Sequence, residues 1–428
     1  MSLSIADALT QENGTEVTLN GWVQDFRVLK TVSFIVLRDH TGVLQVTVKK
    51  DREVLQNAIS SLQRETVVSV KGKLNKEALT KNGIEVVADS LTVLNISATP
   101  LPLGVIDKVN ADIETRLNNR FIDLRKEENN LIFRSESELL WGIRKYLHEQ
   151  KFVEVHTPKI VAAATEGGAD LFPVQYFEKN AYLNQSPQLY KEILISAGFN
   201  RVFEVGPAFR AEKHNTPRHL NEFTSIDIEM GFSDHTDAMQ MLQESIKSGV
   251  KQLRSTLGEY LNSHGINLPE PPDKFPKITY NECIEFLSNK NEVVNFGSDF
   301  TPENLKIIGS EFPSFYFITE WPSDLRAFYT MPKPGHEELS NSFDLQFKEF
   351  EITSGAQRVH DPGMLEMRLR KKGLNPDEFS FYTNAFRYGM PPHAGWGLGL
   401  ERLTMIMLNL HNIREVTLFP RDRTRISP

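Results

Sequence analysis

Two segments place basic side chains where they could bind a triphosphate. Arg210 follows a strand-like run, a polar loop with Arg218 and His219 comes next, and Arg402 follows a glycine-rich string at 395–399. A guanidinium can bind two phosphate oxygens at once, and such groups stabilise the charge that builds up during attack on phosphorus. These residues therefore predict chemistry at a phosphate of a bound nucleotide.

The polar loop joins two strand-like runs, 201–209 and 223–232, which predicts a long antiparallel hairpin. Side chains alternate along a strand, so Phe223 and Asp227 share one face. The ring can stack on adenine, and the carboxylate can hold the ammonium group of an amino acid. The alternative is a solvated strand face without a ligand, and the nearby Arg210 favours a binding site instead.

A second pair of strands is expected around a tight connection at 348–349. It would bring Asp344 and Glu351 together, and two carboxylates repel unless a cation lies between them. Mg²⁺ that bridges phosphates takes one or two carboxylates and water, and Ser354 could complete its surroundings. Arg358, farther along, could bind a carboxylate of a substrate. A hairpin with two solvated acids is the alternative.

A short helix is expected after the Gln-Ser-Pro-Gln string. Ser186 as N-cap and Pro187 in the first turn predict its start, and Gly198 predicts its end. Gln188 and Lys191 then share one helical face and could receive an anion such as a side-chain carboxylate. The alternative is an ordinary surface lysine.

The glycine-rich string is weak evidence by itself, because dinucleotide-binding folds also use spaced glycines. No βαβ pattern or acidic ribose partner follows it, which argues against that alternative. A strand that leads into a helix from about Glu401 fits instead. Its glycines would let adenine lie flat on the sheet, and Arg402 could reach the γ-phosphate.

Composition and charge describe a soluble globular protein with two or three domains. The chain has 428 residues, 40% hydrophobic and 24% charged, and no long uncharged apolar run, so no membrane association is expected. The N-terminus lacks a secretory pattern, and the single cysteine, Cys283, excludes an intrachain disulfide and fits a cytoplasmic location. The net charge of -8 neither supports nor excludes an RNA partner.

The N-terminal part reads as five strands with one inserted helix, which is typical of an OB-fold barrel. The expected strands are 17–23, 33–39, 43–48, 66–70 and 84–94, and the expected helix is 52–62. We therefore expect an OB-fold domain at 1–103, a polar hinge at 104–130 and an α+β domain at 131–428. Residues 270–335 read as an insertion without a chemical interpretation.

In order and spacing, residues 209–223 and 395–402 resemble motifs 2 and 3 of the class II aminoacyl-tRNA synthetases. The helix expected at 132–150, with the strand at 152–155 and Pro158, resembles motif 1, a dimer interface in that family. The resemblance covers nearly the whole chain and is closest to the archaeal-type aspartyl-tRNA synthetases. It implies a class II catalytic domain, built on an antiparallel sheet flanked by helices, in a homodimer.

The helix start at 185–188 resembles the Gln-Ser-Pro-Gln element of the aspartyl branch, whose lysine, here Lys191, binds the side chain of aspartate. The asparaginyl branch does not typically keep this lysine. Residues 164–169, with Glu166, resemble the family's flipping loop, which closes over bound aspartate. A generic turn is the alternative for that loop.

The resemblance implies a role for each matching residue. Arg210 and Arg402 would act in catalysis. The residues expected to bind aspartate are Glu166, Gln188, Lys191, Arg210, Asp227, Ser354 and Arg358. Those expected to bind ATP are Arg210, Ala211, Glu212, Arg218, His219, Leu220, Phe223, Glu351, Gly399, Leu400, Glu401 and Arg402. Those expected to hold Mg²⁺ are Asp344, Glu351 and Ser354.

The barrel is expected to bind the anticodon, because OB-folds stack single-stranded bases on exposed aromatic rings beside basic residues. Phe34, with Arg27 and Gln45 on neighbouring strands, resembles the family's pocket for the middle anticodon base. The alternative places Phe34 in the barrel core. A position near Gln24 helps related enzymes accept or reject tRNA(Asn), and Gln24 matches neither pattern.

The implied activity is ATP-dependent attachment of L-aspartate to tRNA(Asp) through an aspartyl-adenylate, with charging of tRNA(Asn) left open. An asparaginyl-tRNA synthetase, a tRNA-independent asparagine synthetase and a catalytically silent RNA-binding paralogue are the alternatives. The N-terminal barrel argues against the second, and the presence of every expected catalytic position argues against the third.

Overall fold

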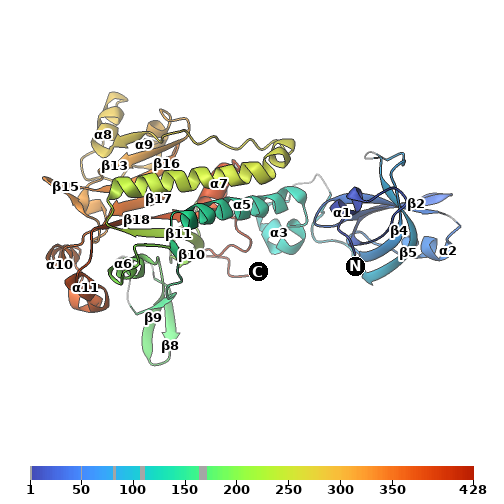
Figure 1. Ribbon diagram of the computed structural model, residues 1–428, viewed down its shortest axis with the longest axis horizontal. Helices are drawn as coiled ribbons and strands as arrows, with labels where there is room; N and C mark the ends of the chain where they lie inside the picture. The colour runs from blue at the N-terminus through green and yellow to red at the C-terminus, as the bar shows by residue number, and fades with distance from the viewer. Residues whose placement is uncertain (1, 50, 81–82, 107–110, 163–170) are drawn as a thin grey trace. The chain divides into compact units, whose positions relative to one another are not determined.

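The computed structural model describes the chain except for residues 1, 50, 81–82, 107–110 and 163–170. Compactness divides it into two units, Met1–Lys126 and Glu127–Pro428 (Figure 1). In the described ranges, no helix combines the length and the apolar character needed to cross a bilayer. The expected flipping loop at 164–169, with Glu166, lies outside the described residues.

The first unit contains a closed five-stranded barrel, which confirms the expected OB-fold. The strand order is β1-β2-β3-β5-β4, with bounds β1 (Glu16–Val28), β2 (Val32–Arg38), β3 (Val43–Lys49), β4 (Val67–Asn75) and β5 (Glu85–Asn95). Helix α2 (Glu53–Ser60) follows β3 as expected, and α1 (Ile5–Thr10) precedes the barrel. Gly72 lets two strands approach closely, since a Cβ there would lie 2.2 Å from the carbonyl oxygen of Val87.

The segment expected as a polar hinge contains two short helices, α3 (Ile113–Asn118) and α4 (Arg120–Asp123). Its arginines are fixed by carboxylates. Arg120 pairs with Asp123 at 2.6 Å, both side chains being almost fully buried, and Arg125 pairs with Glu65 of the barrel at 2.9 Å. Buried charges need such partners, and the pair of Arg125 with Glu65 attaches the segment to the barrel.

An eight-stranded, mostly antiparallel sheet forms the centre of the second unit, as the resemblance implied. The strand order is β12-β13-β16-β17-β18-β11-β10-β6. The bounds are β6 (Val153–Glu154), β10 (Arg201–Phe209), β11 (Glu222–Gly231), β12 (Lys277–Thr279), β13 (Phe315–Thr319), β16 (Ser342–Phe347), β17 (Phe350–Gln357) and β18 (His393–Gly399). Two small sheets accompany it, formed by β7 (Ile160–Val161), β8 (Pro173–Tyr176) and β9 (Lys179–Leu183), and by β14 (Pro332–Lys333) and β15 (His336–Ser340).

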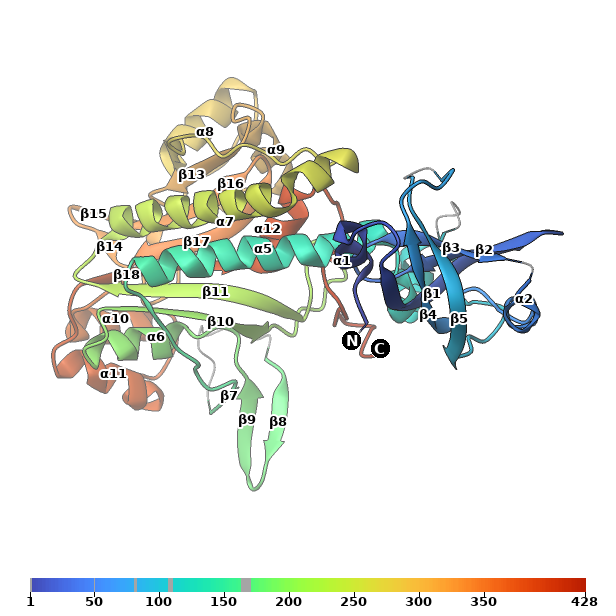
Figure 2. The same cartoon turned by 45° about the vertical axis from the view of Figure 1, so that its right-hand side comes forward.

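Helices flank the large sheet. Helices α5 (Glu127–Glu149) and α7 (His235–Ser263) run side by side along it, whereas α6 (Gln188–Ser196), α10 (Pro362–Lys371) and α11 (Ser380–Arg387) lie beyond β10 and β11 (Figures 1 and 2). Gly142 of α5 permits the close contact with α7, because a Cβ there would lie 2.7 Å from the carbonyl oxygen of Ser248. Helix α12 (Leu400–Met407) continues directly from β18.

Residues 270–335 extend the sheet. They contain β12, β13, α8 (Tyr280–Asn289) and α9 (Pro302–Gly309), packed around a core of their own that includes Tyr280, Phe300 and Trp321. Strand β13 is antiparallel to β16, with Ile318 opposite Asp344. The core of this segment is therefore tied directly to a strand that carries a predicted metal ligand.

Two buried carboxyl groups meet where α5 packs on α12. Burial and the neighbouring Glu401 raise the pKa of Glu136 to about 8, although a hydrogen bond with Thr404 opposes the shift. Oε2 of Glu136 and Oε2 of Glu401 are buried without a hydrogen-bond partner among the described residues. We infer that the Glu136 carboxyl is protonated in the folded protein at neutral pH.

Replacing Glu136 by glutamine should therefore remove a pH dependence of stability. The folded-state pKa of about 8 exceeds the ordinary value of 4.5, so between these values the folded protein keeps a proton that the unfolded chain has released. The free energy of unfolding of the wild type should fall relative to that of E136Q by about 1.4 kcal/mol per pH unit in this window. Urea unfolding at a mildly acidic and a mildly alkaline pH measures it, with exposed Glu128→Gln as the control. A constant difference between E136Q and the wild type would contradict protonation.

Candidate active site

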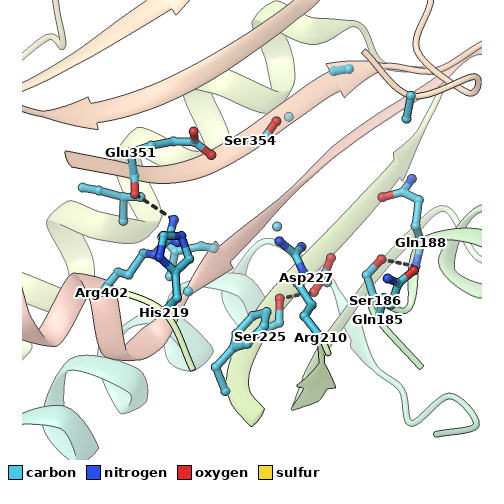
Figure 3. Close-up of a pocket in the computed structure, with 18 of the residues that line it drawn as sticks. Gln185, Ser186, Gln188, Arg210, His219, Ser225, Asp227, Glu351, Ser354 and Arg402 are labelled. Carbon is cyan, nitrogen blue, oxygen red and sulfur yellow. Dashed lines mark hydrogen bonds between the residues drawn. The ribbon is translucent and has the colours of Figure 1, made fainter. Parts of the chain in front are cut away.

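A cavity of about 270 Å³ opens over strands β11, β17 and β18 beside the start of α6 (Figure 3). It gathers most of the predicted site residues, although they come from distant parts of the chain. The predicted residues that line it are Gln188, Arg210, Glu212, Arg218, His219, Leu220, Phe223, Asp227, Glu351, Ser354, Arg358, Gly399, Glu401 and Arg402.

Four other residues predicted for the aspartate, ATP or metal sites are described but do not line this cavity: Lys191, Ala211, Asp344 and Leu400. The side chain of Leu400 is buried in the hydrophobic core, and Ala211 lines a neighbouring cavity. Lys191 contacts the lining residue Asp227, and Asp344 contacts the lining residue Arg326.

The cavity carries a cluster of guanidinium groups, as the two basic segments predicted. The guanidinium of Arg210 lies 5.4 Å from the ring centre of Phe223, and that of Arg218 lies 4.3 Å from the ring centre of Phe350. Arg402 donates to the carbonyl oxygen of Glu351 at 3.2 Å. These contacts fix the cations near one another, a costly arrangement that an anionic ligand would relieve.

The pKa of His219 is affected by the positive charge of this cluster. Burial lowers the pKa of its imidazole, and Arg402, Arg210 and Arg218 lower it further, although Glu212 acts in the opposite direction. A neutral imidazole beside three guanidinium groups leaves their positive charge available for a polyanion.

The loop that carries Arg218 and His219 is held by residues that the sequence did not reveal. Nδ2 of Asn221 donates to the carbonyl oxygen of Arg210 at 2.7 Å. From the C-terminal segment, Arg414 donates to the carbonyl oxygen of Thr216 at 3.0 Å, and Arg423 donates to that of Lys213 at 2.9 Å. No sequence spacing could show the contacts of Arg414 and Arg423, because these partners lie about 200 positions from the loop.

At the other end of the cavity, two cations and two acids alternate. Nζ of Lys191 lies 2.9 Å from Oδ1 of Asp227 and 3.6 Å from Oε2 of Glu229. Arg358 Nε donates to Oε1 of the same Glu229 at 3.1 Å. All four side chains are almost fully buried, so Lys191 is not the ordinary surface lysine considered as an alternative.

The glycines of β18 make room for these acids. Asp227 pairs with Gly397 and Glu229 with Gly395 across the β11–β18 ladder. A Cβ on Gly395 would lie 2.4 Å from Oε2 of Glu229, and one on Gly397 would lie 3.0 Å from Oδ1 of Asp227. Both belong to the glycines predicted to let adenine lie on the sheet, and the structure shows that they are needed to leave space for the acids of β11.

Behind the cavity, Glu192 accepts three hydrogen bonds. Gln188 Nε2 donates to it at 2.6 Å, the Tyr382 hydroxyl donates at 2.7 Å, and Nε2 of His393 lies 3.0 Å from it. Nδ1 of His393 lies 2.8 Å from the carbonyl oxygen of Pro391, so both ring nitrogens face acceptor oxygens. Although burial opposes ionisation, His393 and Arg358 lower the pKa of Glu192.

This layer fixes the direction of Gln188 and was missed from the sequence. Its one local signal was the spacing of Gln188 and Glu192, which are four residues apart on α6. The predicted N-cap was wrong, since the N-cap of α6 is Pro187 and not Ser186. The Ser186 hydroxyl still accepts from the N–H of Gln188 at 3.1 Å. Gly198 follows the helix with φ of 93°, as its predicted position required.

The two predicted metal acids lie on adjacent strands but not directly opposite. Asp344 pairs with Ser354, and Glu351 pairs with Gln346, because the register shifts between Leu345 and Gln346. Desolvation by the surrounding protein and the charge of Asp344 raise the pKa of Glu351 to about 7. A cation near both carboxylates would relieve this repulsion, so the residues fit a magnesium site.

Arg326 is a cation of this region that the sequence did not indicate. Its guanidinium binds Asp344 through two hydrogen bonds, at 2.6 and 3.1 Å, and donates to the Ser354 hydroxyl at 3.3 Å. The described residues contain no group of three or more histidine, cysteine or acidic side chains that could hold a metal ion by themselves. Any metal here would need further oxygen ligands from a substrate or water.

On the barrel, Phe34 and Arg27 are paired directly across strands β1 and β2. Phe34 is half-buried and alternates with the buried Ser33 and Ile35, so it is not part of the barrel core. Gln45 lies on β3 opposite Val36 and donates to Glu85 of β5 at 3.1 Å. The three predicted residues thus lie on neighbouring strands, with Glu85 as an additional polar group.

The matches to known families agree with both units. Residues 112–423 match the family described as tRNA synthetases class II (D, K and N), and residues 17–94 match the OB-fold nucleic acid binding domain family. The aspartate–tRNA(Asp) ligase of Thermoplasma volcanium is 62% identical to this chain over 412 residues, which cover 96% of each chain. The aspartate–tRNA(Asp/Asn) ligase of Archaeoglobus fulgidus is 47% identical over 431 residues, which cover 100% of each chain.

Among solved structures, the asparaginyl-tRNA synthetase from Pyrococcus horikoshii complexed with asparaginyl-adenylate superposes with a TM-score of 0.91 at 31% identity, covering 97% of each chain. The aspartyl-tRNA synthetase from Entamoeba histolytica gives a TM-score of 0.87 at 32% identity, covering 100% of this chain and 93% of that chain. The family match spans most of the chain, and the relatives are similar over nearly their full lengths. This chain belongs to the class II tRNA synthetases of the D, K and N group.

Proposed function

We propose that this protein attaches L-aspartate to tRNA(Asp) at the expense of ATP, through an aspartyl-adenylate. The observation that carries the proposal is the buried group of Lys191, Arg358, Asp227 and Glu229 beside a cavity lined by arginines. This group can accept an amino acid with an anionic side chain, while the arginines accept a triphosphate. The relatives that are 58–62% identical to the chain are named aspartate–tRNA(Asp) ligases.

Charge counting in the buried group favours aspartate over asparagine. Lys191 and Arg358 supply two positive charges, and Asp227 and Glu229 supply two negative charges. The substrate's ammonium group would bind Asp227 and so release Lys191, leaving one net positive charge near the side chain of the substrate. A β-carboxylate neutralises that charge, whereas the amide of asparagine does not.

In the first step, the α-carboxylate of aspartate attacks the α-phosphorus of ATP, and the bond to pyrophosphate breaks. Arg210 would bind the α-phosphate oxygens, where negative charge builds up, and Arg218, His219 and Arg402 would bind the leaving phosphates. In the second step, a terminal ribose hydroxyl of the tRNA takes the aspartyl group, and AMP leaves. No side chain acts as a nucleophile, so positioning and charge neutralisation supply the rate enhancement.

Magnesium is part of the proposal, with Asp344, Glu351 and Ser354 as the residues that would hold it together with phosphate oxygens. Mg²⁺ would supply charge neutralisation at the pyrophosphate. Desolvation and, after it, the charge of Asp344 raise the pKa of Glu351, and a cation near both carboxylates would relieve both effects, which supports this role.

The barrel is proposed to bind the anticodon, with Phe34 as a stacking platform beside Arg27 and Gln45. Gln24 lies at a β-bulge of β1, between Val23 and Asp25, where the register against β2 shifts. Relatives that are 45–49% identical to this chain are named aspartate–tRNA(Asp/Asn) ligases. Charging of tRNA(Asp) and tRNA(Asn) transcripts will decide whether this chain also accepts tRNA(Asn).

A homodimer formed through α5 and β6 is also proposed. Strand β6 ends the eight-stranded sheet, so one of its edges has no neighbouring strand in the described part of the chain. Val153 on β6 is 47% exposed, and Trp141 on α5 is 57% exposed. An open sheet edge beside exposed apolar side chains fits a self-association surface.

The function is tested by ATP–pyrophosphate exchange with each amino acid in turn. Aspartate should support exchange at a rate at least about 100-fold above that with asparagine, because the amide leaves a buried positive charge unmatched. Exchange with asparagine alone would replace the proposal by an asparaginyl-tRNA synthetase, and ammonia-dependent formation of asparagine would replace it by an asparagine synthetase.

Replacing Arg210 by alanine should abolish aspartate-dependent exchange. The guanidinium is expected to bind the phosphate at which charge develops, and losing such a donor costs roughly 100-fold or more in rate. Circular dichroism and thermal unfolding should stay near the wild type, because Arg210 is only partly buried and lines the cavity. Arg254→Ala, at an exposed ion pair with Glu270, is the control. Near-normal exchange by Arg210→Ala would disprove this site.

Phe34→Ala should lower the charging of tRNA(Asp) without affecting ATP–pyrophosphate exchange. Loss of one stacking platform is expected to lower kcat/KM for tRNA(Asp) by roughly 5- to 100-fold, with pyrophosphate exchange unchanged. Phe121→Ala, which removes an exposed ring elsewhere in the first unit, serves as the control in the same aminoacylation assay. Equal charging by Phe34→Ala and the wild type would remove Phe34 from the anticodon site.

A further inference from the structure

The segment 270–335 places a guanidinium group against Asp344, one of the two predicted metal acids. Strand β13 pairs with β16 so that Ile318 lies opposite Asp344. Trp321 follows β13, is 4% exposed, and donates from its indole nitrogen to the carbonyl oxygen of Ile318 at 3.2 Å. Its ring packs on Tyr280 and Phe300, so the core of the segment holds the indole in place.

The indole in turn fixes Arg326. The guanidinium carbon lies 4.5 Å from the centre of the Trp321 ring, within the range of a cation–π contact. From this platform both terminal nitrogens reach the carboxylate of Asp344, and one also reaches the hydroxyl of Ser354. Arg326 lines the same cavity as Glu351 and Ser354.

The guanidinium therefore contacts two of the three residues proposed to hold magnesium. Asp344 is nearly buried, and its ion pair with Arg326 has one side chain 4% exposed and the other 16% exposed. A pair this well shielded from water neutralises Asp344 effectively. With Asp344 neutralised, the site offers a divalent cation little more than the carboxylate of Glu351.

We propose that Arg326 is an internal counter-ion that pairs with the metal ligand Asp344 while the nucleotide is absent. A divalent cation then binds only together with ATP, whose phosphates supply the missing ligands and give Arg326 an alternative partner. The enzyme thus takes up the metal with its nucleotide instead of holding it beforehand. This inference rests on the proposed function, because it assumes that Asp344, Glu351 and Ser354 form the metal site.

The test measures Mn²⁺, a Mg²⁺ substitute with an electron paramagnetic resonance signal, on the nucleotide-free protein. The wild type should bind it weakly, whereas R326Q should bind it at least about tenfold more tightly, because the buried carboxylate of Asp344 has lost its counter-ion. R326M keeps an unbranched side chain beside Trp321 but removes the charge, and it should show the same gain. R326K keeps the positive charge and should stay near the wild type.

Two further variants locate the effect. R387Q removes an arginine from an exposed ion pair with Glu366 and should leave Mn²⁺ binding unchanged. Adding Glu351→Gln to R326Q should abolish the gain, because the second carboxylate is then lost. A purely structural role for Arg326 would lower the melting temperature without tightening Mn²⁺ binding.

The outcomes separate this inference from the proposed function. If the wild type catalyses aspartate-dependent exchange but R326Q and R326M bind Mn²⁺ no more tightly, the counter-ion role is overturned and the function stands. If the wild type does not use aspartate, the proposed function fails whatever Mn²⁺ shows. Tight binding of Mn²⁺ by the nucleotide-free wild type would also overturn the counter-ion role.

Discussion

The carboxylate of Glu229 is the constraint on which the amino-acid end of the site depends. It is fully buried, it accepts from Arg358, and it lies 3.6 Å from the ammonium of Lys191. Without it, two cations would face each other in a low-dielectric environment at a cost of several kcal/mol. The same side chain lies across Gly395, whose missing Cβ gives it room. The packing of Glu229 against Gly395 therefore determines both the charges at the amino-acid end of the site and the pairing of β11 with β18.

This contact also explains why the register of the central sheet is so firmly determined. A slip of one residue between β11 and β18 would turn the acids toward the helices and place Ile226 and Ile228 at the cavity. It would also bring Glu229 opposite a residue with a side chain, such as the buried Trp396. Both errors bury an unpaired charge, so the native pairing is favoured by electrostatics as well as by packing.

The sequence predicted the parts of the site that use local rules. The parity of β11 correctly placed Phe223 and Asp227 on one face, and helical spacing correctly placed Gln188 beside Lys191. The barrel was predictable because its five strands and one helix follow in order with short connections. Residues 209–223 and 395–402 also indicated the class II family, which the matches to known proteins confirmed.

What the sequence could not show were contacts between distant segments. Glu192 meets His393 across 201 positions, and Arg414 meets the motif 2 loop across nearly as many. Each of these residues looks unremarkable in its own segment, since an isolated glutamate or arginine is usually a solvated surface group. Parity also left the face of Phe34 undecided, because alternation defines two faces and only the closed barrel shows which one is interior.

The segment 270–335 shows why a stretch without motifs can still matter to chemistry. Its aromatic residues build a small core, and Trp321 of this core contacts the guanidinium of Arg326, which lines the cavity. A lysine could supply the same charge, but it could not bind both oxygens of Asp344 while lying flat on an indole. The planar fork of arginine matches the carboxylate and the ring at once. The aromatic core therefore has a chemical consequence, because it fixes the cation that neutralises Asp344.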